Sequence, residues 1–191
     1  MRALLLAAML CATLAAAQTA AKPRVRIDTS YGPVVVELEP GLAPVTVANF
    51  LRYVHEGFYR GTLFHRVIAG FMVQGGGFRE DMTEKPVHEP IVNEVGSTFK
   101  AGLKNVRGTL AMARTADPNS ATAQFFINTH DNVELDPVDG GKAGYCVFGR
   151  VVDGMQAVDK IERVGTVWRH GMPNVPEYPV RIKDVQVLAV P

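Results

Sequence analysis

The segment 64–77, FHRVIAGFMVQGGG, contains most of the side chains that could carry out chemistry. Two apolar runs, 63–68 and 71–74, flank the break Ala69-Gly70 and predict a β-hairpin. A guanidinium, an amide, a thioether and a phenyl ring come together in this hairpin, and the three glycines after it let backbone or a ligand approach closely. Such a surface suits an apolar group with a peptide-like polar edge. The segment holds no nucleophile, metal-ligand set or phosphate-binding loop.

Alternation along each strand predicts which of these side chains share a face. On the first strand His65 is expected to point away from Phe64 and Arg66. On the second strand Met72 and Gln74 are expected to share a face. Taken alone, Arg66 among apolar neighbours would be interpreted as a surface residue whose stem covers apolar groups.

Three blocks of the sequence, in order, resemble the cyclophilins, the prolyl cis-trans isomerases. The first is the segment 64–77, the second combines GTLAMAR at 108–114 with SATAQFFIN at 120–128, and the third is YCVFGRV at 145–151. The resemblance extends from about Val25 to Val187. It is greatest to the exported cyclophilins of Gram-negative bacteria.

The resemblance implies a mainly β fold, namely a closed eight-stranded antiparallel β-barrel capped by two α-helices. It also implies an isomerase of X-Pro bonds that needs no cofactor and acts on proline-containing, unfolded or partly folded polypeptides. The alternative is a chaperone or assembly module that binds proline-containing segments, with incidental isomerase activity. The hydrolase alternative is not favoured, because the sequence has no G-x-S-x-G motif and no persuasive Ser-His-Asp set.

The same resemblance assigns roles to individual residues. It places Arg66 on the family's catalytic arginine and Gln74 on the amide that holds the substrate carbonyl and orients that arginine. The implied substrate-binding residues are Phe71, Met72, Ala113, Arg114, Gln124, Phe126, Leu135 and Tyr145. His65 and Glu134 are secondary candidates. Without the resemblance, the apolar members of this set would be ordinary core residues.

Three positions depart from the family pattern. Arg114 stands where an asparagine is usual, Glu134 replaces the common tryptophan before the pocket leucine, and Tyr145 replaces a histidine. In cyclophilins that tryptophan typically donates its indole N–H to the inhibitor cyclosporin. The sequence therefore predicts an active isomerase with weak cyclosporin sensitivity.

The rest of the chain predicts the supporting elements. A first hairpin is expected at 25–28 and 34–39, and a helix from Pro44 to near Gly57 with an apolar stripe at i, i+3, i+4, i+7 spacing. Further strands are expected at 110–113, 125–128, 145–152 and 180–187, the last with a β-bulge where its alternation slips. A second helix is expected after an Asp153 cap. The segment 80–108 and the proline-rich segment before 180 are expected to be mainly loop.

The first 17 residues predict a secretory signal peptide, because one arginine, an apolar run and Ala15-Ala16-Ala17 occur in that order. We expect cleavage after Ala17 and a periplasmic protein. The expected organisation is 1–17 signal peptide, 18–23 short N-terminal segment and 24–191 isomerase domain. The apolar run is shorter than the ~20 residues of a membrane span, so no stable membrane association is expected.

Composition restricts the remaining possibilities. Lys and Arg total 20 against 19 for Asp and Glu, a balance that gives no support to a nucleic-acid partner. The five histidines show no paired metal-ligand spacing, so no metal site is expected. After cleavage Cys146 would be the only cysteine, and its apolar neighbours predict a buried, unreactive thiol. A monomer is expected.

Overall fold

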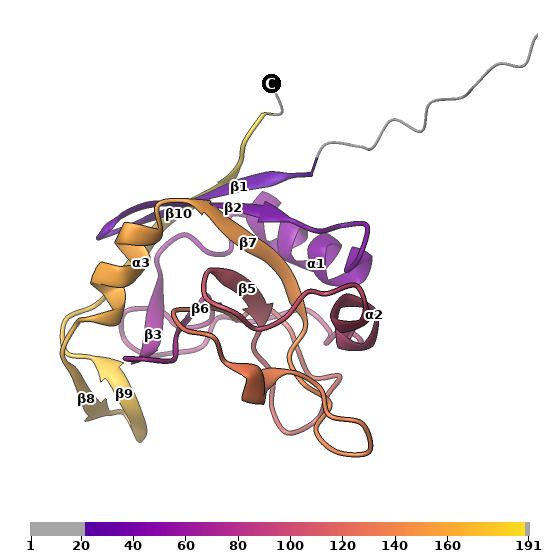
Figure 1. Cartoon of the computed structure of the whole chain (residues 1–191). Coiled ribbons are helices and arrows are strands. Elements are labelled where there is room, and N and C mark those ends of the chain that lie inside the picture. The colour runs from indigo at the N-terminus through magenta and orange to yellow at the C-terminus, as the bar shows by residue number, and fades with distance from the viewer. Residues whose placement is uncertain (1–21, 190–191) are drawn as a thin grey trace, which may run out of the picture.

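The computed structural model describes residues 22–189, in which eight strands close into an antiparallel barrel (Figure 1). Their order around the barrel is β1-β10-β3-β4-β6-β5-β7-β2. The bounds are β1 Arg24–Thr29, β2 Gly32–Leu38, β3 Thr62–Ile68, β4 Met72–Gly75, β5 Thr109–Met112, β6 Phe125–Asn128, β7 Val147–Asp153 and β10 Arg181–Val187. The predicted barrel is thereby confirmed. The predicted signal peptide lies outside the described residues.

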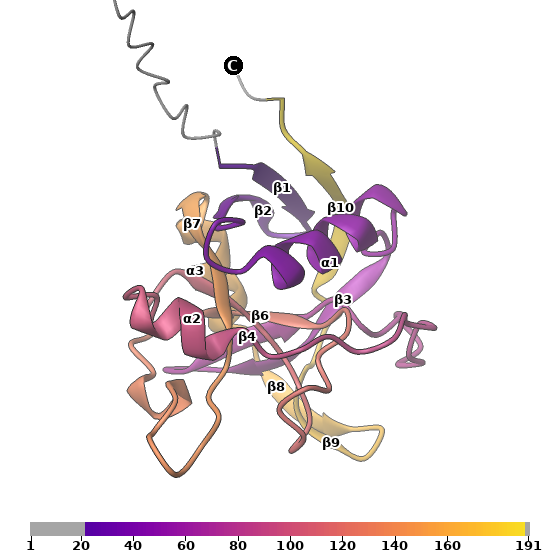
Figure 2. The ribbon, with the colours of Figure 1, turned by 90° about the vertical axis from the view of Figure 1, so that its right-hand side faces the viewer.

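The first helix, α1 (Pro44–His55), begins with a proline at its first turn, where no intrahelical N–H is required. Its cap comes from elsewhere in the chain, because the Glu94 carboxylate accepts from the backbone N–H groups of Val45 and Thr46 at 3.1 and 2.7 Å. Val47, Phe50 and Val54 are buried in the core, as the spacing predicts. The helix itself lies against the barrel strands (Figure 2).

The second long helix, α3 (Met155–Glu162), confirms the prediction except for its cap. Asp153 is not the N-cap; that position is Gly154, with φ of 83° and no side-chain capping bond. A Cβ on Gly154 would lie 2.2 Å from the Pro33 carbonyl oxygen, so the helix approaches β2 too closely for any other residue. Val158 and Ile161 form the buried inner face of the helix. Helices α1 and α3 lie on opposite sides of the barrel (Figure 1).

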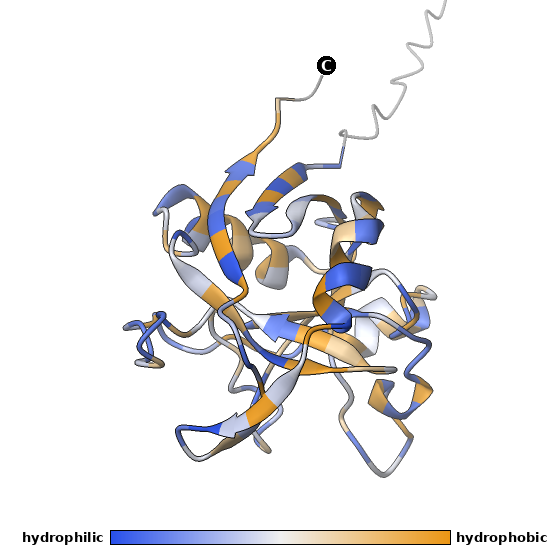
Figure 3. Cartoon of the chain, turned by 90° about the vertical axis from the view of Figure 1, so that its left-hand side faces the viewer, coloured by the Kyte–Doolittle hydropathy of each residue, from blue (hydrophilic) through white to orange (hydrophobic). Residues whose placement is uncertain are grey.

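Two segments contain more structure than predicted. The mainly irregular segment 80–108 includes a short helix, α2 (Val95–Lys100). The proline-rich segment before β10 is not simply a loop, because β8 (Thr166–Arg169) and β9 (Met172–Pro176) form a separate two-stranded sheet. This hairpin projects from the barrel (Figures 2 and 3). Its turn, His170-Gly171, has φ of 52° and 76°, the backbone that two-residue hairpins favour.

Two β-bulges change which side chains share a face. In β10, Asp184 pairs with Asp28 and Ile182 with Thr29, so Lys183 is the extra residue and the predicted phase slip is confirmed. In β3, Phe64 pairs with Gly75 and Arg66 with Gln74, so His65 is the extra residue. The prediction that Phe64 and Arg66 share a face is therefore wrong. The bulge turns Phe64 into the barrel and Arg66 onto its outer surface.

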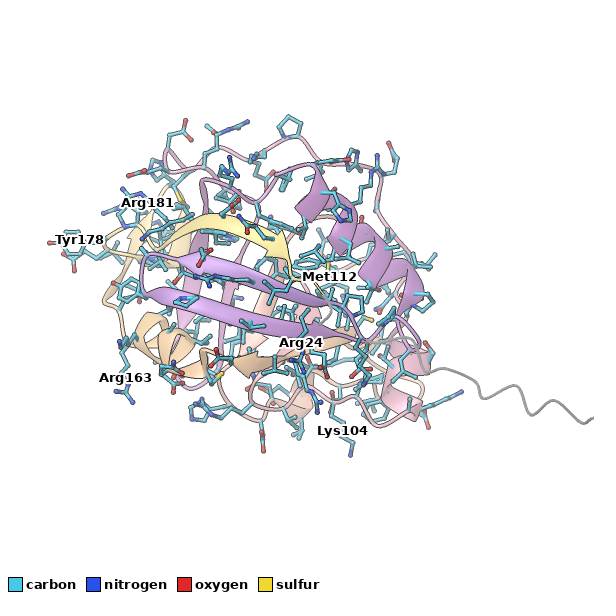
Figure 4. All side chains as sticks on the ribbon, turned by 90° about the horizontal axis from the view of Figure 1, so that it is seen from above. Arg24, Lys104, Met112, Arg163, Tyr178 and Arg181 are labelled. Carbon is cyan, nitrogen blue, oxygen red and sulfur yellow. The ribbon has the colours of Figure 1, made fainter. Side chains whose placement is uncertain are left out.

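The inside of the barrel is filled by aromatic and branched side chains. Phe50 of α1 lies 5.6 Å from Phe125 of β6 and 5.3 Å from Phe148 of β7, between ring centroids, so the helix is packed into the core. Met112 lies within the outline of the barrel, whereas Tyr178 projects from its edge (Figure 4). Cys146 is buried, as predicted, and burial raises the pKa of its thiol. None of the helices within 22–189 has the length and apolarity needed to span a bilayer.

Candidate active site

A pocket of about 190 Å³ on the outer surface of the barrel brings together nine of the residues selected from the sequence. It is lined by Arg66, Phe71, Met72, Gln74, Ala113, Arg114, Phe126, Leu135 and Tyr145. These residues come from β3, the turn into β4, β4 itself, the end of β5, β6, the 3-10 turn Val133–Leu135 and the segment before β7. We call this pocket the slot.

Arg66 and Gln74 are direct cross-strand partners at one edge of the slot. The Arg66 Nη1 donates to Gln74 Oε1 at 3.3 Å, and Gln74 Nε2 donates to Gln124 Oε1 at 3.0 Å. Because a guanidinium can only donate, Arg66 fixes the orientation of the Gln74 amide, which in turn fixes that of Gln124. The three side chains form a hydrogen-bonded row along the slot, in which Arg66 donates to Gln74 and Gln74 donates to Gln124.

The Arg66 guanidinium is half-buried, and burial lowers its pKa because desolvation disfavours the charged form. Within residues 22–189, no carboxylate lies within 4.0 Å of it. Its charge is therefore only partly compensated by one neutral amide. Such a group gains free energy when a ligand presents an acceptor to it.

The floor of the slot is apolar and rests on the barrel wall. Met72 is 2 % exposed and Phe126 is 4 % exposed, and both pack with Ala111 and Val147 in a cluster separate from the interior core. The neighbouring Phe125 points into the barrel, which confirms that one of the two phenylalanines faces the groove and the other the core. Partly buried Phe71 and Leu135 form the walls. The slot is therefore a preformed apolar recess with one cationic edge.

Phe71 owes its place to the turn between β3 and β4. The Phe71 N–H donates to the Ile68 carbonyl at 3.1 Å, and Gly70 within this turn has φ of 73°, which glycine adopts without strain. The Gly70 N–H donates to the Glu162 carboxylate of α3 at 2.8 Å. The turn is thus anchored to a helix rather than left as a loose loop tip.

Arg114 and Tyr145 also line the slot. The Arg114 guanidinium lies 4.3 Å from the centroid of the Tyr145 ring, a cation–π arrangement. It also donates to the Gly144 carbonyl at 3.0 Å and to the Thr115 carbonyl at 2.8 Å. The donors of the Arg114 guanidinium are therefore already used by backbone carbonyls of the protein, which distinguishes Arg114 from Arg66.

Gln124 lies in a second hollow of about 220 Å³ that shares Gln74, Ala113 and Arg114 with the slot. A Cβ on Gly77 would lie 2.6 Å from Gln124 Cγ, so glycine leaves room for this side chain. The three glycines at 75–77 were expected to admit backbone or a ligand. At Gly77 the space is taken by Gln124, and at Gly75 by the backbone of β3, since a Cβ there would lie 2.7 Å from the Leu63 carbonyl oxygen.

The two secondary candidates lie beside the slot rather than in it. Glu134 is exposed and lines a third hollow of about 490 Å³, together with Arg114, Leu135 and Tyr145. His65 is 4 % exposed and its ring packs 4.5 Å from the Phe78 ring, between centroids. Burial, reinforced by the nearby Arg66 charge, lowers the pKa of His65 to about 4.

Sequence reasoning did not identify the buried amides behind the slot wall, Asn105, Asn128 and Asn132. One signal was present, because Asn128 ends the otherwise apolar strand FFIN. A buried asparagine requires hydrogen-bond partners. In the described part of the chain, no three His, Cys, Asp or Glu side chains are placed to hold a metal ion.

Comparison with known proteins gives consistent matches over this domain. The profile of the family described as cyclophilin type peptidyl-prolyl cis-trans isomerase/CLD matches residues 24–187. A peptidyl-prolyl cis-trans isomerase of Acinetobacter baylyi is 48% identical over 177 residues, covering 93% of this chain and 92% of the relative. Peptidyl-prolyl cis-trans isomerase B of Escherichia coli is 53% identical over 168 residues, covering 85% of this chain and 98% of the relative.

A solved structure agrees with the fold. The cyclophilin type peptidyl-prolyl cis-trans isomerase of Cryptosporidium parvum, determined in the presence of the dipeptide Ala-Pro, superimposes with a TM-score of 0.73 at 29% identity. The match covers 87% of this chain and 99% of that chain.

Proposed function

The chain belongs to the cyclophilin-type peptidyl-prolyl cis-trans isomerases, and from this membership we propose that Arg66 accelerates X-Pro rotation by stabilising the twisted amide. One observation carries the proposal. A half-buried guanidinium with no carboxylate within 4.0 Å, among the described residues, borders an apolar recess lined by Phe71, Met72 and Phe126. The recess would hold the proline ring while Arg66 meets the amide next to it.

The chemistry follows from amide resonance. Resonance gives the X-Pro bond double-bond character and a rotation barrier of about 18–20 kcal/mol. In the twisted state this resonance is lost, and the nitrogen becomes pyramidal and basic. A guanidinium that donates to that nitrogen, or holds the carbonyl oxygen, binds the twisted state better than either planar state. Gln74, which Arg66 orients through the 3.3 Å hydrogen bond, is the second polar group at this edge.

The required energies are moderate. Lowering the barrier by about 6–8 kcal/mol gives a rate increase of roughly 10⁴–10⁶. One charge-assisted hydrogen bond supplies about 2–4 kcal/mol of this in a desolvated site. The clamp on the proline ring and the exclusion of water from the slot must supply the rest.

We also propose that the substrates are exported polypeptides during folding. The support is the order of residues at 1–17, with one arginine, an apolar run and three alanines before Gln18. Uncatalysed X-Pro exchange takes tens to hundreds of seconds and limits folding, which gives such an enzyme its purpose. Fractionation of cells followed by N-terminal sequencing tests this proposal. A periplasmic chain beginning at Gln18 supports it, and a cytoplasmic chain that retains Met1 contradicts it.

The isomerase proposal is tested by cis-to-trans conversion of a short alanyl-prolyl peptide. The purified mature chain should accelerate conversion in a protease-coupled assay. It should also broaden the peptide's NMR signals through exchange, in an experiment that needs no protease. Catalysis that is independent of Arg66 would contradict the proposed role of the guanidinium.

A further inference from the structure

Four buried polar side chains behind the slot form one continuous hydrogen-bonded network. They are Asn105, Asn128, Asn132 and Asp136, with exposures of 1, 0, 3 and 7 %. Most polar groups this deep in a protein are hydrogen-bonded, and partly satisfied networks are costly. Specific hydrogen bonds therefore hold these four side chains in place, and the same bonds reach the backbone of residues that line the slot.

One end of the network holds the walls formed by Leu135 and Tyr145. The Asn105 Nδ2 donates to the Leu135 carbonyl at 3.3 Å and to the Tyr145 carbonyl at 3.2 Å. It also donates to Asp136 Oδ1 at 2.9 Å, so its two N–H groups are shared among three oxygens. The Tyr145 N–H in turn donates to the Leu135 carbonyl at 2.9 Å. One side chain thus joins two slot-lining residues that are ten positions apart in the sequence.

The other end holds the wall formed by Phe71. The Asn132 Nδ2 donates to the Phe71 carbonyl at 2.8 Å, and the Thr129 N–H donates to the same oxygen at 3.0 Å. The two ends meet at Asn128, whose Nδ2 donates to Asn105 Oδ1 at 3.2 Å and whose Oδ1 accepts from Asn132 Nδ2 at 2.7 Å. The network therefore spans the slot from behind.

The orientation of every amide in the network is determined by the backbone carbonyls at its ends. A carbonyl oxygen can only accept, so Asn105 must turn its NH₂ group toward Leu135 and Tyr145 and its oxygen toward Asn128. Asn128 must then present N–H to Asn105 and its own oxygen to Asn132. Asn132 is left with N–H groups, and one of these reaches Phe71. None of these three side-chain amides can be flipped without leaving two donors or two acceptors facing each other.

We propose that this asparagine network is a positioning device that sets the width of the proline slot, by fixing the Phe71, Leu135 and Tyr145 walls relative to one another. This inference rests on the proposed function of the slot. It adds residues that do not line the slot, and it assigns them to substrate binding rather than to the chemical step. Their loss should therefore raise KM more than it lowers kcat, whereas the loss of Arg66 should lower kcat.

The sharpest test is Asn132→Asp, which keeps the shape of the side chain and removes its N–H donors. At pH 7.5 the carboxylate would face the Phe71 carbonyl and the Asn128 oxygen, and we expect kcat/KM to fall about tenfold, mainly through KM. On acidification the new carboxyl group takes up a proton and regains one donor. The ratio of variant to wild-type kcat/KM should therefore rise as the pH is lowered from 7.5, without reaching one, because a protonated carboxyl group donates once whereas Asn132 donates twice.

A matched control separates positioning from general loss of stability. Ile27→Ala removes a fully buried side chain from β1, a strand whose neighbours β2 and β10 do not line the slot. It should lower Tm at least as much as Asn132→Asp and leave KM within twofold of wild type. If Asn132→Asp does not fold, Asn132→Ala takes its place, with the same expected rise in KM.

The outcomes are decisive in both directions. A wild-type KM in a folded Asn132 variant with a lowered Tm overturns the inference, because the network would then be merely structural. The dissociation constant of the alanyl-prolyl peptide, measured by NMR titration, should rise by the same factor as KM. That measurement does not require turnover. Wild-type activity in Arg66→Ala would contradict the proposed mechanism. The NMR titration would still test the positioning role in that case.

Discussion

The two faces of β3, β4 and β6 are built from neighbouring residues but differ in how completely they are filled. Inside the barrel, Phe125 is fully buried and its ring packs against the rings of Phe50, Tyr59 and Phe64. On the outside, the adjacent Phe126 forms the floor of a recess that is open to solvent. The inner face is filled by the protein's own side chains, whereas the outer recess is filled only when a ligand binds.

The polar groups differ in the same way. The interior cluster is built from aromatic, aliphatic and sulfur-containing side chains, with the Thr46 and Thr98 hydroxyl groups beside Cys146, while the outer recess has the Arg66 guanidinium at its edge. A charge held in this position, without a carboxylate within 4.0 Å among residues 22–189, lowers the stability of the folded chain. Residues one position apart should therefore affect different measurements, with inner residues changing the free energy of unfolding and outer residues changing the rate of isomerisation.

The largest expected effect comes from Phe125→Ala, compared with Phe126→Ala. Removing a ring from the packed interior should lower the free energy of unfolding by about 3–5 kcal/mol. Removing the slot floor should cost less stability, because the space opens to solvent, and should reduce kcat/KM at least tenfold. Urea unfolding and the peptide assay on both variants measure the two effects. Equal losses of stability, with full activity in Phe126→Ala, would remove the distinction between the faces.

The next effect is that of Arg66→Ala, which should lower kcat/KM by at least ~10-fold and up to ~10²–10³-fold, or roughly 1.4–4 kcal/mol of transition-state binding. Far-UV spectra should match wild type and Tm should stay near or slightly above it, since no ion pair is lost and a partly desolvated charge is removed. Arg66→Lys should not restore the rate, because an ammonium lacks the planar fork of the guanidinium. Wild-type activity in the alanine variant would favour the proline-binding module instead.

Glu134 tests how far the functional surface extends beyond the slot. It lines the neighbouring hollow and is exposed. Because it is a glutamate, it provides neither the ring nor the N–H donor that cyclosporin meets in other family members. Glu134→Trp should tighten cyclosporin binding by roughly 30- to 1,000-fold, equivalent to about 2–4 kcal/mol, and change kcat/KM little. Inhibition titrations measure this. Tight inhibition of the native enzyme would show that Glu134 does not occupy the tryptophan position.

Most of the barrel strands could be predicted from local alternation, and the nine slot residues could be selected only through the resemblance of short motifs to the cyclophilins. The relation between Phe64 and Arg66 could not be predicted, since a bulge depends on the register with the partner strand β4. The hairpin β8–β9 was missed because Pro173 and Pro176 argue against a strand. Both residues lie in a two-stranded sheet, where a missing N–H at an open edge is tolerated.

The asparagine network shows a different limit of sequence reasoning. Asn105 and Asn128 are 23 positions apart, and neither lies in a motif whose chemistry is evident from its spacing. Their role depends on which backbone carbonyls lie within reach once the barrel has closed. By contrast, Phe125 and Phe126 were distinguishable from the sequence, since strand geometry alone places adjacent residues on opposite faces.

The smallest expected effect concerns His65, the bulge residue next to Arg66. Burial, helped by the Arg66 charge, lowers its pKa from 6.5 in the unfolded chain to about 4 in the folded chain. Between these values the unfolded chain binds more protons, so this contribution to stability is fully present above pH 6.5 and is lost as the pH falls toward 4. From pH 7 to pH 5 the loss should be about 2 kcal/mol.

His65→Gln removes this titration, so the variant should lose about 2 kcal/mol less stability than wild type between pH 7 and pH 5. The carboxyl groups whose pKa is lowered, such as Glu37 and Asp184, titrate below this range and do not obscure the difference. Urea unfolding at both pH values gives the four free energies required. Parallel losses in wild type and variant would show that His65 is protonated in both the folded and the unfolded chain at pH 5. Because the ring packs against Phe78 and does not line the slot, kcat/KM at pH 7 should change less than twofold, in contrast to the neighbouring Arg66.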